Sequence, residues 1–174
     1  MIKHVSQSAM SICAVFLTFG HAWGLSWPEG ARSITLEDFQ HRAGELWTCR
    51  LHDGHASFSS LERQYFFEDT DHTTSGGQIA GLFHSVTLDQ GTLIAQGFQI
   101  KRVNKGSAYL RRTYVTDDGV DFPQFVGDRV SIPMKVSEDG QHLYPGTFKD
   151  VDGEFQVGIL DCVYANDQKP HWAK

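Results

Sequence analysis

Polar and apolar residues alternate along most of the chain, and short turn sequences separate the alternating runs. From Glu45 onward the runs are rich in Val, Ile, Phe, Tyr and Thr, and each turn places Asp, Asn or Glu shortly before a Gly. Gly takes the positive φ of a tight hairpin turn, and Asp or Asn can hydrogen-bond the turn backbone. The turns are residues 52–55, 89–91, 104–106, 117–119, 138–140 and 150–153.

The runs between these turns predict a series of strands with no helix between them. They lie near residues 45–52, 55–68, 77–88, 92–103, 107–116, 120–126, 129–137, 141–149 and 154–164. Consecutive hairpins form a meander, and a long meander hides its edges when it closes on itself. The sequence therefore predicts an all-β fold, an antiparallel up-and-down meander closed into a barrel of about eight strands.

One short helix is predicted before the sheet. Thr35 stands at its N-cap and Asp38 follows three residues later, which is the start of a capping box. Its apolar face consists of Leu36, Phe39 and Ala43, and Gly44 ends it. We expect residues 25–44 to hold this helix, residues 45–165 to form the barrel domain, and residues 166–174 to be a loose tail.

Residues 1–24 have the organisation of a signal peptide. Lys3 gives a basic start, and residues 9–19 form an uncharged, mostly apolar run that is shorter than the ~20 residues of a membrane-spanning helix. Ala22 and Gly24 supply the small residues of a cleavage site. We expect cleavage after Gly24, with Ala22 as the alternative, and a periplasmic or secreted protein. A short membrane anchor or a buried helix is the competing interpretation.

The cysteines are the sharpest signal in the composition. Cys13 lies in the expected signal peptide, which leaves Cys49 and Cys162 as one possible pair. Cys49 lies in the first predicted strand and Cys162 in the last, and these two strands are neighbours in a closed meander. The sequence predicts a disulfide across the closing seam, with two free buried thiols as the alternative.

The net charge of the chain limits the classes of partner that it is expected to bind. The formal charge is −6 for the whole chain and becomes −7 once Lys3 is removed with the signal peptide. Nucleic-acid binding needs a basic stripe, so this balance disfavours nucleic acid as a partner. No second apolar run follows, so we expect no stable membrane anchor after cleavage. The oligomeric state is left open.

The entry to the first strand, Gly44-Glu45-Leu46-Trp47 after a short helix, resembles the lipocalin-like (calycin) barrels. Those families carry a Gly-x-Trp motif at this point, whereas two residues separate Gly44 from Trp47 here. Their basic residue from the last strand, which packs over the Trp, has no clear match. The resemblance covers about 130 residues in layout. It implies an eight-stranded barrel with a mouth that can hold an apolar small molecule.

An eight-stranded barrel is either filled by side chains or holds one small molecule. Glycines within predicted strands mark curvature or leave space, and they are Gly81, Gly97 and Gly158. We expect an apolar cavity open at one end, which binds a small apolar or amphipathic molecule. The predicted ligand-binding residues are Ile132, Met134, Arg112 and Trp47. Arg112 itself is expected to face solvent; an inward Arg112 would need an anionic partner.

The histidines offer one candidate metal pair. His52 and His55 flank Asp53-Gly54, and a two-residue turn would oppose their rings on one face, where Zn²⁺ or Cu²⁺ could bind. A polar hairpin tip is the alternative. His84 is expected to be a satisfied core or barrel histidine. The sequence contains no G-x-S-x-G or H-E-x-x-H, and we predict no catalytic residue and no cofactor.

These observations favour an exported, non-enzymatic barrel that binds a small, partly apolar molecule. Two other functions stay open at this point. One is a hydrolase or isomerase that uses some of the histidines. The other is an interaction or inhibitor module whose interior is filled and whose loops bind the partner.

Overall fold

The protein is described here from a computed structural model of residues 25–55, 58, 62–68, 81–89, 91–151 and 154–174. The strands are β1 (Arg32–Ser33), β2 (Leu46–Gly54), β3 (Glu62–Glu68), β4 (Leu82–Asp89), β5 (Thr92–Asn104), β6 (Ser107–Asp117), β7 (Val120–Asp121), β8 (Arg129–Val136), β9 (His142–Val151) and β10 (Glu154–Asn166). The helical elements are α2 (Leu36–Gln40) and the 3₁₀ turn η3 (Pro123–Phe125).

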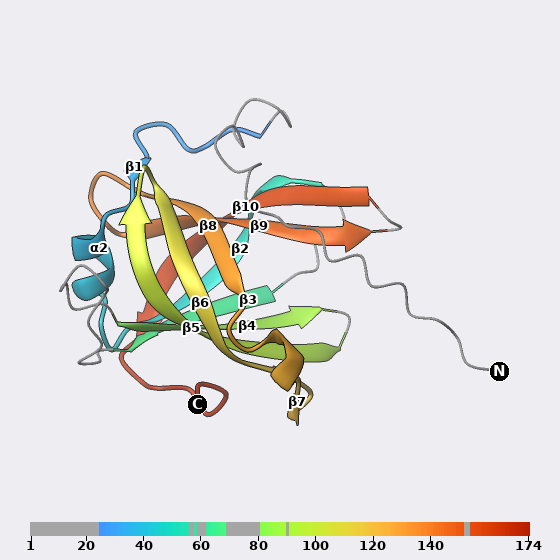
Figure 1. The fold of residues 1–174 in the computed structure, drawn as a ribbon. Coiled ribbons are helices and arrows are strands. Elements are labelled where there is room, and N and C mark those ends of the chain that lie inside the picture. The colour runs from blue at the N-terminus through green and yellow to red at the C-terminus, as the bar shows by residue number, and fades with distance from the viewer. Residues whose placement is uncertain (1–24, 56–57, 59–61, 69–80, 90, 152–153) are drawn as a thin grey trace.

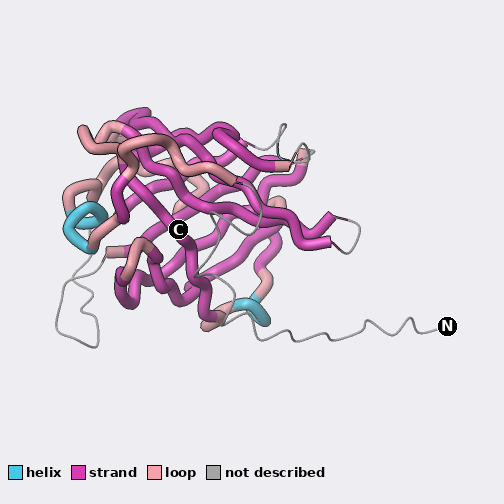
Figure 2. Tube along the Cα trace, turned by 90° about the horizontal axis from the view of Figure 1, so that it is seen from above, coloured by secondary structure: helices cyan, strands magenta, loops and turns pink. Residues whose placement is uncertain are grey.

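Eight of these strands form a closed antiparallel barrel (Figure 1). Each strand of the series β2-β3-β4-β5-β6-β8-β9-β10 pairs with the next, and β10 pairs back with β2. The short strands β1 and β7 add to β8 and β6. In Figure 2 strands make up most of the described chain, and the two short helical elements lie at its margin. The predicted all-β, closed up-and-down barrel with one short helix is confirmed.

Two predicted local features are wrong. The predicted strand 120–126 is only the two residues of β7, after which Pro123 begins the 3₁₀ turn η3. Proline lacks the N–H that a continuing ladder requires. The turn expected at Asp53-Gly54 is absent, because β2 runs through Gly54 and pairs it with Gly158 of β10. A Cβ on Gly54 would lie 2.8 Å from the Gly158 Cα, so this glycine permits close strand approach.

Aromatic side chains fill much of the barrel interior. The rings of Tyr65 and Phe83 are stacked with centroids 4.8 Å apart, and Phe98 lies 5.9 Å from Phe83. Phe39 of α2 packs edge-on against Phe67 at 5.6 Å. Phe39 brings the helix into the same buried cluster as the barrel strands. Hydrophobic burial of this kind is the dominant stabilising contribution to such a fold.

The helix begins where the sequence predicts, and it ends earlier. Thr35 accepts a hydrogen bond from the backbone N–H of Asp38, and Asp38 accepts one from the backbone N–H of Thr35, which completes the capping box. The helix ends at Gln40, and the expected end at Gly44 follows a further turn. Burial alone would raise the pKa of Asp38, but hydrogen bonds from Arg32 and Thr35 lower it to about 2.

The C-terminal segment packs against the outer face of the barrel, in contrast to the loose tail expected from the sequence. Trp172 and Ala173 are buried in a cluster with Leu46, Phe66 and other residues of β2 to β5. At the other end of the described chain, Leu25 is buried against β9 and β10. Both segments that flank the barrel therefore contribute to its packing.

No helix among the described residues is long and apolar enough to cross a membrane.

Candidate functional site

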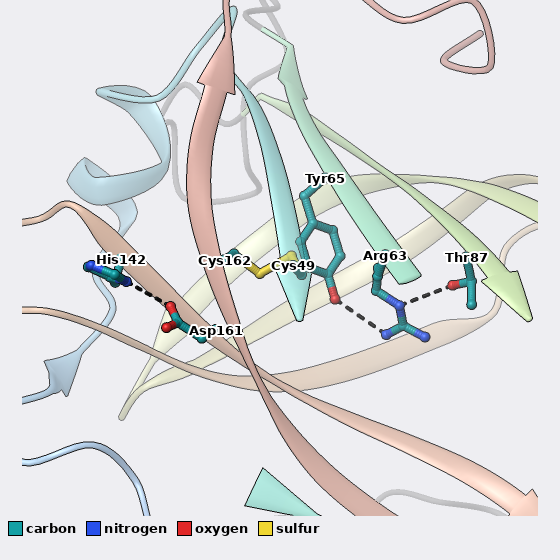
Figure 3. The surroundings of a disulfide bond; sticks show 7 residues. All are labelled: Cys49, Arg63, Tyr65, Thr87, His142, Asp161 and Cys162. Carbon is teal, nitrogen blue, oxygen red and sulfur yellow. Dashed lines mark hydrogen bonds and ion pairs between the residues drawn. A yellow bond between two sulfur atoms is a disulfide. The ribbon is translucent and has the colours of Figure 1, made fainter. Parts of the chain in front are cut away.

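The disulfide marks the closing seam of the barrel. Cys49 of β2 lies directly opposite Cys162 of β10, and the two sulfurs are bonded (Figure 3). Both residues are buried in the interior cluster. The predicted pairing is therefore present in the structure, at the position where the first and last long strands meet.

A groove lies beside this disulfide. Among the described residues, the pairing of β2 with β3 runs from Leu46–Phe66 to Cys49–Arg63, and β2 continues to Gly54 along β10. The groove, of about 1090 Å³, lies between the β2–β3 side of the barrel and the C-terminal segment. Its lining comprises Thr48, Cys49, Arg50, Leu51, Glu62, Arg63, Gln64, Val86, Leu88, Leu93, Pro170, His171 and Trp172.

One wall of the groove is apolar. Val86 and Leu88 of β4 and Leu93 of β5 line it together with Trp172. Leu88 is 40% exposed, although it is a large aliphatic residue. A ligand that covered Leu88 would remove this apolar surface from water, which is favourable by about 25 cal/mol per Å².

Arg63 lines the groove from the interior face of β3, and the apolar wall of Val86, Leu88 and Leu93 belongs to the outer face. Its Nε donates to Thr87 Oγ1 at 3.0 Å, and its Nη1 donates to the Tyr65 hydroxyl at 3.3 Å (Figure 3). Both acceptors are neutral, and within the described part of the chain no carboxylate forms an ion pair with Arg63. The side chain is half-buried. A partly desolvated guanidinium held by neutral hydroxyls retains the capacity to bind an anion.

A second polar cluster joins the barrel to its C-terminal segment. The Nε2 of His84 lies 2.9 Å from Glu68 Oε2, and its Nδ1 lies 3.0 Å from the Tyr114 hydroxyl. The carboxylate only accepts, so Nε2 carries the proton and Nδ1 accepts from Tyr114 in neutral His84. Lys169 pairs with Glu68, and the backbone N–H of Lys174 donates to the Tyr114 hydroxyl. Burial lowers the pKa of His84, and Glu68 partly offsets this.

A smaller pocket of about 480 Å³ lies beside α2, and Arg42 and Trp47 are among its lining residues. The Arg42 guanidinium lies 5.3 Å from the ring centroid of Trp47. It also donates to the backbone carbonyls of Asp38 and Gly140. The basic residue that packs on this Trp thus comes from the segment after the helix, upstream of β2. The resemblance had suggested the last strand as its source.

The four predicted ligand residues are not brought together in the groove. Ile132 and Met134 point into the barrel interior as members of the packed cluster, where Met134 is 1% exposed. Trp47 is buried beneath Arg42. Because bulky side chains already occupy these positions, a ligand at Met134 would have to displace them.

Arg112 differs from the solvent-facing position expected for it. Its side chain is 19% exposed and forms an ion pair with Asp128 at 3.1 Å. Its guanidinium lies 5.8 Å from the Phe98 ring centroid, and Phe98 belongs to the interior cluster. The inward alternative, which requires an anionic partner, is the one found, because a register shift at Gly97/Phe98 places Arg112 opposite Phe98. Burial lowers the pKa of Arg112, and Asp128 opposes that effect.

The turn that would have placed His52 opposite His55 as a metal-binding pair is absent. His52 lies within β2, and no two-residue turn opposes it to His55. Among the described residues no group of three or more His, Cys, Asp or Glu could hold a metal ion. Metal binding by His52 and His55 stays a prediction. The polar segment 69–77 lies outside the described residues.

Sequence reasoning missed Arg63 and the role of Trp172. A signal for Arg63 was present, because strand alternation places it on the same face as Tyr65 and Phe67, which are core residues. A charge on an apolar strand face indicates either a buried pair or a ligand contact. No comparable signal exists for Trp172, whose partners are distant in the sequence.

Comparisons with protein-family models, with curated proteins and with solved structures find no match to this chain. The geometry of the chain itself therefore carries the assignment of fold and site. That geometry is a closed, eight-stranded antiparallel barrel, and it is compatible with a calycin-like fold.

Proposed function

We propose that this barrel is an exported binding protein for a small amphipathic molecule with an anionic head group. The observation that carries the proposal is Arg63, a half-buried cation that lines the groove from the interior face of β3 and is bonded to two neutral hydroxyls. The ligand's anionic end would contact Arg63, and its apolar part would lie along Leu51, which lines the same groove and packs against the interior cluster. The site differs from the position beside Ile132 and Met134 expected from the sequence.

The dimensions of the groove support a small ligand. Ligand sites in proteins are about 300–1,000 Å³, mostly apolar, with a few polar groups that fix orientation. The groove, at about 1090 Å³, is slightly larger than this range. The groove also contains Arg50 and Glu62, so its lining carries charges of both signs. We assign the contact with the anionic group of the ligand to Arg63 because it is more buried than Arg50.

The compartment is proposed on two grounds. A disulfide is stable in the oxidising environment outside the cytoplasm, and Cys49 and Cys162 are bonded. Residues 1–24 have the organisation of a signal peptide and lie outside the described residues. The intact mass of the exported protein tests this point, because export through a cleaved signal removes about two dozen residues.

Titration calorimetry with two matched probes tests the ligand. Decanoate and decan-1-ol share a chain length and differ in charge. We expect wild type to bind decanoate more tightly than decanol. Arg63→Met should weaken decanoate binding roughly 10- to 100-fold, because charged hydrogen bonds contribute about 1.5–3 kcal/mol. It should leave decanol binding nearly unchanged.

Three further variants separate specific from general effects. Arg63→Lys keeps the charge and should retain part of the preference for decanoate. Leu51→Ala removes apolar surface on the same side as Arg63 and should weaken the binding of both probes. Lys101→Met, on β5 away from the groove, should change neither. Equal binding of the two probes by wild type, or unchanged decanoate binding by Arg63→Met, would refute the proposal. Binding of neither probe would favour the interaction module.

A further inference from the structure

Three neighbouring strands carry an excess of positive charge on a protein that is acidic as a whole. The strands β5, β6 and β8 contain six basic residues and one acidic residue, Asp117, whereas the formal charge of the chain is −6. The basic residues are Lys101, Arg102, Arg111, Arg112, Arg129 and Lys135. Arg112 faces inward and is paired with Asp128, and the other five residues give one side of the barrel a local positive potential.

Two arginines on this side oppose each other directly. Arg111 of β6 and Arg129 of β8 are partners in the ladder, and both are exposed. No carboxylate pairs with either of them in the part of the chain that the structure describes. Like charges directly opposite each other destabilise a sheet. Arg102 adds a third positive charge near this pair. Its guanidinium lies 4.2 Å from the ring centroid of Tyr109, which is two residues before Arg111 on β6.

An apolar tip adjoins the arginine pair. The connection from β6 to β8 exposes Val120 by 62%, Val126 by 51% and Phe125 by 41%. It is held to the barrel by hydrogen bonds from the Phe122 N–H to the Val115 carbonyl and from the Gly127 N–H to the Arg112 carbonyl. In Figure 1 this connection, with β7, lies at one extremity of the barrel.

The C-terminal end of the tip lies next to Arg111. A Cβ on Gly127, the residue after Val126, would lie 3.7 Å from Nη2 of Arg111. Four aspartates lie at or beside the tip, and three of them have partners within the protein, although the side chains of Asp121 and Asp128 are 69% and 49% exposed. Asp128 pairs with Arg112 and Asp121 with Lys174, while Asp118 accepts from the Leu93 N–H.

We propose that this basic and apolar face docks on the surface of a membrane that contains anionic phospholipid. The lipid phosphates would contact Arg111 and Arg129, and Val120, Phe125 and Val126 would enter the interface between head groups and acyl chains. Peripheral binding follows from buried apolar area together with attraction to anionic lipid. A soluble polyanion accounts for the arginines and leaves the exposed apolar tip without a role.

Sedimentation with vesicles tests the proposal on the disulfide-bonded protein. We expect it to bind vesicles of phosphatidylglycerol and phosphatidylcholine, and not vesicles of phosphatidylcholine alone. The double variant Arg111→Gln/Arg129→Gln should weaken this binding by roughly 25-fold, about fivefold for each charge. Val120→Ser/Val126→Ser should weaken it at unchanged net charge.

A charge-matched control removes the effect of net charge. Arg50→Gln/Lys169→Gln also loses two positive charges, one on β2 and one in the C-terminal segment, and should bind within about threefold of wild type if the face is specific. Arg63→Met should bind vesicles normally, which separates this face from the groove. Equal loss in the control, or arginine-dependent binding to heparin without binding to vesicles, would overturn the proposal. Lack of binding by wild type would do the same.

Discussion

The absence of a side chain at Gly97 allows the side chains of Tyr114 and His84 to meet. It lies on β5 between His84 of β4 and Tyr114 of β6, and pairs with both. A Cβ at this position would lie 2.5 Å or less from two atoms of the Tyr114 ring. The ring therefore lies across the glycine and brings the tyrosine hydroxyl within 3.0 Å of His84. The sequence suggested curvature or a cavity for Gly97, and the structure shows a register shift beside it together with close approach of the Tyr114 ring.

Gly97→Val should release this contact. The valine side chain would displace the Tyr114 ring, and the hydroxyl that contacts Trp172 and Lys174 would move with it. We expect the free energy of unfolding to fall by about 1–3 kcal/mol, the usual cost of overpacking. Hydrogen exchange at residues 172–174 should accelerate. Gln99→Val, on the same strand, is the control, and equal acceleration in both variants would contradict this account.

Asp38 makes the stability of the fold depend on pH in the acid range. Its folded-state pKa of about 2 lies below its ordinary value of 3.8. Ionised Asp38 therefore stabilises the fold fully above about pH 4, and this contribution is lost as the pH falls through about 2. The shift corresponds to about 2 kcal/mol.

Asp38→Asn should thus be less stable than wild type by about 2 kcal/mol at pH 7. The gap should narrow between about pH 4 and pH 2, because wild-type Asp38 becomes protonated in that interval. Urea unfolding across this range measures both quantities. Glu138→Gln, an exposed change of the same charge, should follow wild type throughout. A constant gap at every pH would show that the charge of Asp38 is not the cause.

At the scale of elements, the ladder between β2 and β10 closes the barrel. It joins segments far apart in the chain, and the disulfide links residues 113 positions apart within it. A crosslink over a loop of this length stabilises by roughly 4–5 kcal/mol in the chain-entropy model. The ladder hydrogen bonds and the interior packing on either side do not require the crosslink.

Cys49→Ala/Cys162→Ala should therefore keep the barrel and lower its free energy of unfolding by about 3–5 kcal/mol. Circular dichroism reports the fold, and guanidinium unfolding reports the stability. Reduction of wild type should produce the same loss, whereas reductant should leave the double variant unchanged. Wild-type stability in the double variant would contradict a stabilising role for the bond.

Across the whole molecule, the sequence predicts topology better than the site. Alternation and turn residues are local signals, so the meander and its closure could be predicted. The turn at Gly54 was wrong because glycine serves close approach as readily as it serves a turn. The groove depends on how β2 and β3 diverge among the described residues beyond Cys49 and Arg63, and on where Trp172 packs. Both are contacts between distant segments, which periodicity does not report.

Closure also imposes an order in time. A chain made from its N-terminus can form the central hairpins as they emerge, but β2 lacks one neighbour until β10 has been made. At about 5–20 residues per second, the 113 residues that follow Cys49, up to and including Cys162, take about 6–23 s to synthesise. Throughout that interval one edge of β2 is unpaired, and Cys49 lacks its disulfide partner. Barrel closure therefore waits for β10, and one strand edge needs protection until then.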